Sequence, residues 1–356
     1  MAAKGRARTE AKRARLPLSE QSSGMGPTFQ HAGNGLSWSF SRDQMLRSCE
    51  RKYFFQYLAN AFLNSPEPWL RAIALLKKVK NIPMWQGECV HDAIAEFLTR
   101  YQEGNDVQFD RLALNLQQRM TRDWNFSEKR QFREEPASIG RFGAALFEHE
   151  YNEVPPETLL TELVREAREM LWSFYKWAHS HPTFLSDFRT AKRRWIEPPP
   201  WGDAAPGFVV REVRAVTKVD LALHLSDGQF RIYDWKTGKR PATERGGTSN
   251  STQVSIYMLW PHLVMNFPLE KVTSSLVYLG DSEAQEIKFQ LDEELAVETK
   301  QIIWDSVEQA QRWEGYVKSG RLTIETIDFA SSVNQCRKCN FKRVCRAALT
   351  QRYYHE

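Results

Sequence analysis

Two carboxylates and a lysine lie close together in the second half of the chain and could bind a hard cation. Asp220 ends one apolar run, and Asp234 follows fourteen residues later, with Lys236 two positions beyond it. Because alternate residues of a β-strand point to the same side, Asp234 and Lys236 would share one face. Carboxylate oxygens suit Mg²⁺ or Mn²⁺, which keep water molecules that can act as nucleophiles. The lysine could orient such a water or neutralise the charge of a phosphate.

The acid–x–Lys triplet is a weak signal when it stands alone. The chain contains five such triplets, whereas about two are expected by chance, and a solvated ion pair would explain any one of them. Only Asp234–Lys236 combines a predicted strand with an aspartate on the preceding strand. Asp227-Gly228 is a hairpin turn signal between residues 221–225 and 230–236, so a hairpin would bring Asp220 and Asp234 together.

The cysteines form a second group that could carry chemistry. Cys336, Cys339 and Cys345 crowd within ten residues near the C-terminus, and Cys49 lies far upstream. Five cysteines in a chain without a secretory signal argue against a disulfide framework. The arrangement predicts a metal or cluster site with one remote ligand, and four thiolates can hold zinc as readily as a [4Fe–4S] cluster. Cys89 remains, and we interpret it as a small core residue.

Two polar pairs fall on predicted helices. His91 follows Gly87 by four positions at the start of an amphipathic segment, and Tyr257 follows Gln253 by four, which places each pair on one helical face. A helical histidine is more often packed or exposed than a ligand, and a Gln/Tyr pair is usually a polar stripe.

The elements that must position these residues follow from periodicity. Apolar 3.6-residue patterns predict helices over residues 39–58, 85–101, 157–179, 253–264 and 291–318. Runs rich in Val, Ile, Phe and Tyr predict strands over residues 191–197, 208–225, 230–236, 272–279 and 284–290. Residues 102–190 read as mostly helical. The chain thus begins with helices, continues with strands and interspersed helices, and ends in a Cys-rich segment.

Composition narrows the class of protein. The 356 residues are 42% hydrophobic, which is enough for a sizeable core, and no apolar stretch is long enough to span a membrane. Residues 1–15 contain six Lys/Arg and one Glu, a net +5 that equals the charge of the whole chain. A uniformly basic protein that coats nucleic acid is therefore excluded. We expect residues 1–35 to be a disordered basic arm and the protein to be cytoplasmic, with organellar or nuclear targeting by this arm left open.

Taken in order, the motifs resemble those of a known family. Ser39 and Ser41 precede Cys49 and its aromatic segment, Gly87 precedes His91, and Asp220 precedes Asp234-Trp235-Lys236; Gln253, Tyr257 and the three tail cysteines follow. This series resembles the RecB-like branch of the PD-(D/E)xK nucleases, specifically its iron–sulfur members, which include AddB-type subunits and CRISPR-adaptation exonucleases. Two positions depart from the family pattern: Thr217 and Glu50 stand where Gly and Pro are usual.

The resemblance implies an α/β, restriction-endonuclease-like mixed sheet flanked by helices. It implies that residues 36–101 form the N-terminal helical part of the nuclease core, 102–190 a helical insertion, 191–320 the remaining core, and 321–356 an iron–sulfur segment closed with Cys49. His91, Asp220, Asp234 and the Trp235 carbonyl would hold Mg²⁺ or Mn²⁺. Lys236 would position the attacking water, and Gln253 and Tyr257 would steady Lys236 or the phosphate. Cys49, Cys336, Cys339 and Cys345 would bind a [4Fe–4S] cluster, with zinc as the alternative.

The expected activity is hydrolysis of DNA that is single-stranded or has free ends, in repair or defence. No Gly-x4-Gly-Lys-Ser/Thr sequence is present, so unwinding would need a helicase or other partner protein. The rival hypothesis is a non-catalytic nucleic-acid-binding or scaffold subunit of a larger complex. Products formed in the presence of Mn²⁺ or Mg²⁺ would separate the two.

Overall fold

The computed structural model describes residues 37–153, 158–197, 206–242 and 249–345. The basic arm expected over residues 1–35 and the last residues of the Cys-rich segment lie outside the described residues. Within the described ranges, no helix is both long enough and apolar enough to cross a membrane.

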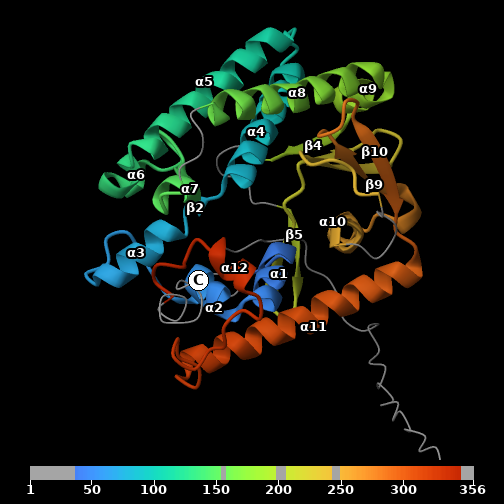
Figure 1. Cartoon of the computed structure of the whole chain (residues 1–356). Coiled ribbons are helices and arrows are strands. Elements are labelled where there is room, and N and C mark those ends of the chain that lie inside the picture. Colours follow the sequence, from blue (N-terminus) through green and yellow to red (C-terminus); the bar gives the residue numbers. More distant parts are fainter. Residues whose placement is uncertain (1–36, 154–157, 198–205, 243–248, 346–356) are drawn as a thin grey trace, which may run out of the picture. The chain divides into compact units, whose positions relative to one another are not determined.

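A mixed five-stranded sheet forms the centre of the fold (Figure 1). Its strands, in spatial order, are β10 (Gln285–Gln290), β9 (Val272–Tyr278), β8 (Phe230–Lys236), β7 (Leu221–His224) and β4 (Arg193–Ile196). β8 and β9 are parallel, and α10 (Ser249–Met265) lies between them in the chain, whereas the other neighbours are antiparallel. The β7–β8 hairpin turns at Gly228, whose φ of +82° favours glycine.

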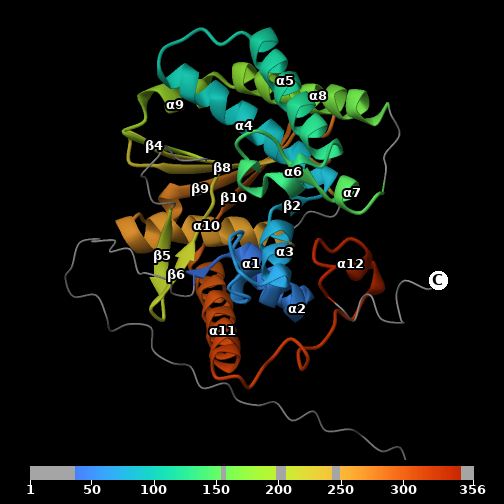
Figure 2. The same ribbon diagram turned by 90° about the vertical axis from the view of Figure 1, so that its left-hand side faces the viewer.

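Helices cover both faces of this sheet (Figures 1 and 2). On one face lie α4 (Ile82–Gln102), α5 (Phe109–Glu128), α8 (Leu159–Ser180) and α9 (Pro182–Thr190); on the other lie α10 and α11 (Glu293–Lys318). The apolar side chains of β8 show why both faces of the sheet must be buried under helices. Tyr233 and Trp235 pack into the first core, and Phe230 and Ile232, on alternate positions, pack into the second. This architecture confirms the mixed α/β fold predicted from the sequence.

Shorter elements complete the fold. A three-stranded sheet contains β1 (Ser37–Trp38), β6 (Val213–Val216) and β5 (Gly207–Val210), and a two-stranded one contains β2 (Val79–Lys80) and β3 (Ala145–Leu146). The remaining helices are α1 (Phe40–Ser48), α2 (Glu50–Tyr53), a π-helical turn (Phe54–Leu58), α3 (Pro68–Leu76), α6 (Gln131–Glu134), α7 (Phe147–Glu150), α12 (Val333–Arg337), and 3₁₀ turns at Pro136–Ser138 and Leu269–Lys271.

Two segments differ from their predicted elements. Residues 39–58 form α1, α2 and the π-helical turn instead of one helix, because Cys49 has an extended backbone and ends α1. The Cys49 sulfur then accepts a hydrogen bond from Lys52 N and caps α2. Residues 208–225 form β5, β6 and β7 instead of one strand, because Arg211 and Glu212 adopt positive φ and turn the chain.

The helices within residues 102–190 share their core with the sheet. Trp177 and Phe174 of α8 are buried and contact the Trp235 ring of β8. Trp172, on the other side of α8, is 43% exposed and stacks on Tyr175. The segment therefore packs on the strand that carries Asp234 and Lys236.

Candidate active site

The β7–β8 hairpin places the two predicted carboxylates opposite each other. Leu221 pairs with Tyr233, and the next position of this antiparallel register sets Asp220 opposite Asp234. Residues opposite each other in a sheet point to the same face. Asp220 Oδ2 accepts a hydrogen bond of 2.7 Å from the Trp235 backbone N–H, which fixes its carboxylate beside β8. The Trp235 ring is buried on the opposite face, and the predicted role of its carbonyl stays a prediction.

His91 reaches this pair from α4. Its Nδ1 lies 3.1 Å from Asp220 Oδ1. The helix approaches β8 closely, because a Cβ at Gly87 would lie 3.2 Å from the Thr237 hydroxyl, just beyond Lys236. Gly87 thus lets α4 bring a histidine to a carboxylate 129 residues away in the chain.

Lys236 is held between the sheet and α10. Its Nζ lies 2.7 Å from Asp234 Oδ2 and donates a 3.0 Å hydrogen bond to Gln253 Oε1. Gln253 Nε2 in turn donates to the Tyr257 hydroxyl at 2.6 Å. The structure thus brings together the predicted side chains of His91, Asp220, Asp234, Lys236, Gln253 and Tyr257.

Burial and like charge shift the titration of the site. Burial and the neighbouring Asp220 raise the pKa of Asp234 to about 6, although Lys236 opposes the shift. Burial alone would lower the pKa of His91, but the charge and hydrogen bond of Asp220, with Asp234, raise it to about 9. Burial and both carboxylates raise the pKa of Tyr257 well above its ordinary value. The phenol therefore stays protonated, and the carboxylates repel each other.

The donor set has the chemistry of a divalent-cation site. Asp234 is 4% exposed, and its Oδ2 is paired with the Lys236 ammonium. His91 and Lys236 neutralise the carboxylates in this arrangement. Within the described ranges, no three His, Cys, Asp or Glu side chains converge closely enough to enclose one metal ion. The oxygens of Asp220 and Asp234 fit a hard cation in type and charge, and ligation would require the side chains to exchange partners.

One acidic residue at the site was not singled out by sequence reasoning. Ile196 pairs with Leu221 across β4 and β7, so Glu197 lies opposite Asp220, and its backbone N–H donates to the Asp220 carbonyl at 3.0 Å. The available signal was that Glu197 ends the predicted strand over residues 191–197. Sequence alone could not show that this strand is the neighbour of β7.

Four of the five cysteines line a cavity at a separate site. Cys49, Cys336, Cys339 and Cys345 line one cavity of about 420 Å³ together with Arg51, Lys52, Lys338 and Lys342. None of the five cysteines, all within the described ranges, forms a disulfide. Burial raises the pKa of Cys336, and raises that of Cys339 to about 11. Cys89, on α4, is fully buried in the core, as expected.

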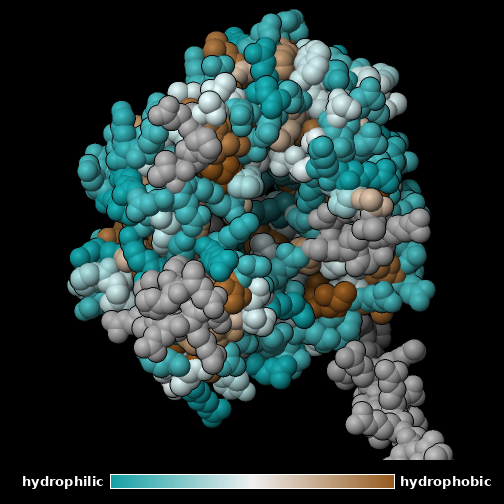
Figure 3. Space-filling view, viewed as in Figure 1, coloured by the Kyte–Doolittle hydropathy of each residue, from teal (hydrophilic) through white to brown (hydrophobic). Residues whose placement is uncertain are grey.

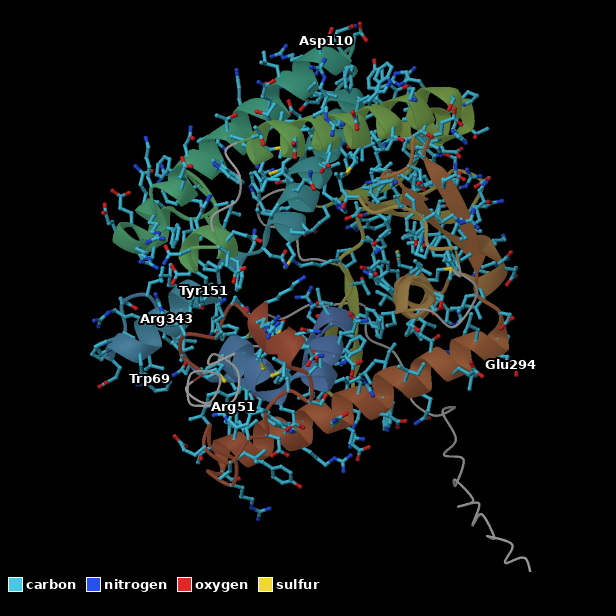
Figure 4. All side chains as sticks on the ribbon, viewed as in Figure 1. Arg51, Trp69, Asp110, Tyr151, Glu294 and Arg343 are labelled. Atoms are coloured by element: carbon cyan, nitrogen blue, oxygen red, sulfur yellow. The ribbon has the colours of Figure 1, made fainter. Side chains whose placement is uncertain are left out.

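Contacts beyond the cysteines hold the C-terminal segment in place. The Lys342 ammonium is buried over the Tyr151 ring, 4.2 Å from its centre. Tyr151 donates a hydrogen bond of 2.7 Å to the Asn340 carbonyl, and Arg343 pairs with Glu150 of α7 at 2.6 Å. Figure 4 shows Tyr151 and Arg343 next to each other, where this segment meets α7. The cysteine cavity therefore has a framework that does not depend on the thiols.

The face seen in Figure 3 is hollowed near its centre, between the part of the molecule that contains α4 and the part that contains α1. α4 carries His91, and α1 ends at Ser48, directly before Cys49. The helices at the first predicted residue of each group thus border the same hollow.

One of three comparisons with known proteins identifies the family of this chain. The chain is similar to the crystal structure of SSO0001, with 14% sequence identity and a TM-score of 0.27, over 64% of this chain and 97% of that chain. That score is too low to support an argument. No curated protein matches the sequence. The family model of the PD-(D/E)XK nuclease superfamily matches residues 37–346. The span includes both groups of predicted residues, and the chain belongs to the PD-(D/E)XK nuclease superfamily.

Proposed function

We propose that this protein is a metal-dependent DNA nuclease of the RecB-like, iron–sulfur type. The observation that carries the proposal is the convergence of Asp220, Asp234 and Lys236 on one face of the β7–β8 hairpin, with His91 on Asp220. Superfamily membership supports hydrolysis of a phosphodiester.

His91, Asp220, Asp234 and the Trp235 carbonyl are the groups that would hold Mg²⁺ or Mn²⁺. A bound ion of this kind supplies Lewis acidity and lowers the pKa of bound water. Lys236, once released from Asp234, is placed to orient the attacking water or to neutralise charge on the phosphate. Gln253 restrains the Lys236 ammonium, and Tyr257 restrains Gln253. The protein thus positions these groups on β8, directly before β7, and on α4 and α10.

The substrate that we propose is DNA that is single-stranded or has free ends. The resemblance supplies this choice, together with roles in repair or defence. Because the chain has no P-loop, we propose that a helicase or other partner unwinds duplex substrates.

We further propose that Cys49, Cys336, Cys339 and Cys345 bind a structural [4Fe–4S] cluster. The shared cavity of about 420 Å³ leaves room for a multi-iron cluster. Among the described residues, its lining contains four cations and no carboxylate, and the cations offset the negative charge of four thiolates. Zinc is the alternative occupant, and iron and acid-labile sulfide content after anaerobic purification distinguishes the two.

The decisive experiment is cleavage of 5′- and 3′-labelled single strands and duplexes with Mn²⁺ or Mg²⁺. We expect products that EDTA abolishes. DNA binding without products under every condition would favour the non-catalytic subunit. Parallel reactions on RNA define the substrate class.

A further inference from the structure

Helix α11 has a second face besides the one that packs in the core. Ile303 and Val307 lie in the hydrophobic core with the sheet and α10, whereas other positions of α11 line a hollow of about 780 Å³ that this helix shares with α1. We propose that this hollow is the interface of a symmetric dimer, in which the α11 helices of two copies of this chain pack antiparallel. The inference goes beyond the proposed function and does not rest on it.

The hollow leaves large apolar side chains uncovered. Ile302 and Tyr316 of α11 are each 41% exposed, and half-buried Phe40 of α1 and buried Trp313 of α11 line the same hollow. In Figures 1 and 2, α1 lies next to α11. Exposed apolar groups that gather in one hollow, with polar groups around them, are typical of an interaction surface.

The charges at the hollow decide what kind of partner fits. Among the described residues, its lining has two cations, Arg47 and Arg312, and two anions, Asp43 and Asp305. Its net charge is therefore zero, whereas a surface for nucleic acid needs an excess of cations. Asp43 pairs with Arg47 at 2.8 Å. Within the described part of the chain, Arg312 forms no ion pair, and Asp305 accepts a hydrogen bond from Gln301 without an ion pair. One charge of each sign is thus left to attract a partner.

The order of residues along α11 makes this face complementary to itself. Ile302 and Tyr316 lie seven positions to either side of Gln309, and Asp305 and Arg312 lie four positions before it and three after it. These spacings place all five on one side of the helix. When a second copy packs antiparallel, with the two-fold axis near Gln309, Asp305 of each copy comes within reach of Arg312 of the other. Ile302 then lies near Tyr316 of the second copy. A parallel arrangement would instead oppose like charges.

The hollow is preformed, because buried contacts hold α1 against α11. Trp38, just before α1, donates a hydrogen bond of 2.7 Å to the Ser306 hydroxyl of α11, and this hydroxyl donates to Asp43 of α1. All three side chains are buried. The α11 helix of a second copy can therefore enter between α1 and α11 without a rearrangement of either helix, which lowers the cost of association.

The test measures the mass of the full-length protein by sedimentation velocity over a range of concentrations. We expect wild type to reach twice the 41.5 kDa of one chain. Arg312→Asp turns an attraction to Asp305 of the second copy into a repulsion, twice in each dimer, so dimerisation should weaken by about a hundredfold or more. Asp305→Arg combined with Arg312→Asp exchanges the two charges and restores opposite signs across the axis, so the dimer should return.

Lys318→Glu is the matched control. It also reverses a charge on α11, but Lys318 is 68% exposed, pairs with Glu314 of its own helix and does not line the hollow. This variant should keep the mass of the wild-type protein. A single-chain mass of wild type at every concentration would overturn the inference, and so would a dimer that Arg312→Asp leaves intact. A double variant that stays monomeric would overturn the antiparallel register, and equal loss in Lys318→Glu would mean a general effect of net charge.

Discussion

The carboxylate site and the cysteine cavity each bring several acidic groups together, but they limit the resulting negative charge in different ways. At the carboxylate site, both predicted carboxylates have an internal counter-charge: Asp220 has His91, and Asp234 has Lys236. At the cysteine cavity, burial raises the pKa of Cys336 and Cys339, so these thiols are neutral at pH 7. One site is ionised and paired, whereas two thiols of the other are protonated.

The difference teaches what each site needs in order to bind a metal. To bind a divalent metal ion, Asp220 and Asp234 must give up their contacts with His91 and Lys236. This requires only small side-chain movements at the end of the sheet. The thiols must lose protons, so binding there depends strongly on pH and on metal affinity. The framework of Lys342, Tyr151 and Asn340 keeps the cavity in place meanwhile. The two sites should therefore respond independently to substitution, and the predictions below test that independence.

The largest expected effect is at Lys236. Lys236→Ala removes the charge that orients water or neutralises phosphate, so we expect cleavage to fall by about a thousandfold or more. The iron content should not change. Lys288→Ala is the matched control, because Glu286/Lys288 is the same triplet on β10 and Lys288 is 77% exposed. Rates under saturating Mn²⁺ measure both, and wild-type turnover in Lys236→Ala would contradict the assignment.

Cys49→Ser should cause loss of the metal cluster from the cysteine cavity. It removes the ligand that joins the start of the fold to residues 336–345, a long loop whose closure contributes roughly a few kcal/mol in entropy models. We expect loss of iron and a lower thermal midpoint, with Mn²⁺ affinity within about twofold of wild type.

Cys89→Ala is the control for Cys49→Ser, because burial raises the pKa of Cys89 to about 12 and its thiol packs in the core. It should keep the iron. Loss of Mn²⁺ affinity in Cys49→Ser would show that the two sites are coupled after all.

The stability of the metal-free protein should depend on pH through the carboxylate site. The pKa of His91 rises from 6.5 to about 9 on folding, so its ion pair stabilises the metal-free protein fully below pH 6.5 and is lost as the pH rises through 9. Wild type should therefore exceed His91→Gln in free energy of unfolding by about 2 kcal/mol more at pH 6 than at pH 9.5, after allowance for partial exposure. Urea unfolding in EDTA measures this, and a constant difference would exclude a charged His91.

The smallest expected effect is at the loop after Lys236. A Cβ at Gly280 would lie 2.6 Å from the Gly238 carbonyl carbon, so Gly280→Ala must shift the backbone that follows β8. We expect about tenfold slower cleavage, since misplacement of a catalytic group by a fraction of an ångström slows chemistry. Gly315→Ala on α11 has nothing within 4 Å and should leave the rate unchanged. Equal rates in both variants would show that this loop does not position Lys236.

The hairpin was predictable because its determinants are local. The turn at Asp227-Gly228 and the alternation of residues 230–236 fix the strand and its register, and β8 has the bounds that the sequence predicts. The break at Cys49 was not predictable, since α1 and α2 together have an uninterrupted helical pattern. There Cys49 lines a cavity together with Cys336, Cys339 and Cys345, which lie far away in the sequence.

The sequence by itself determined which residues could do chemistry: an acid–x–Lys strand, a preceding aspartate, and cysteines at cluster spacing. Only the tertiary structure decided which other residues lie next to them. His91 meets Asp220 because Gly87 lets α4 approach β8, and Glu197 lies opposite Asp220 because β4, and not β5 or β6, is the neighbour of β7. Turns and alternation are set by nearby residues, whereas the choice of sheet neighbour and helix distance depends on the packing of residues far apart in the chain.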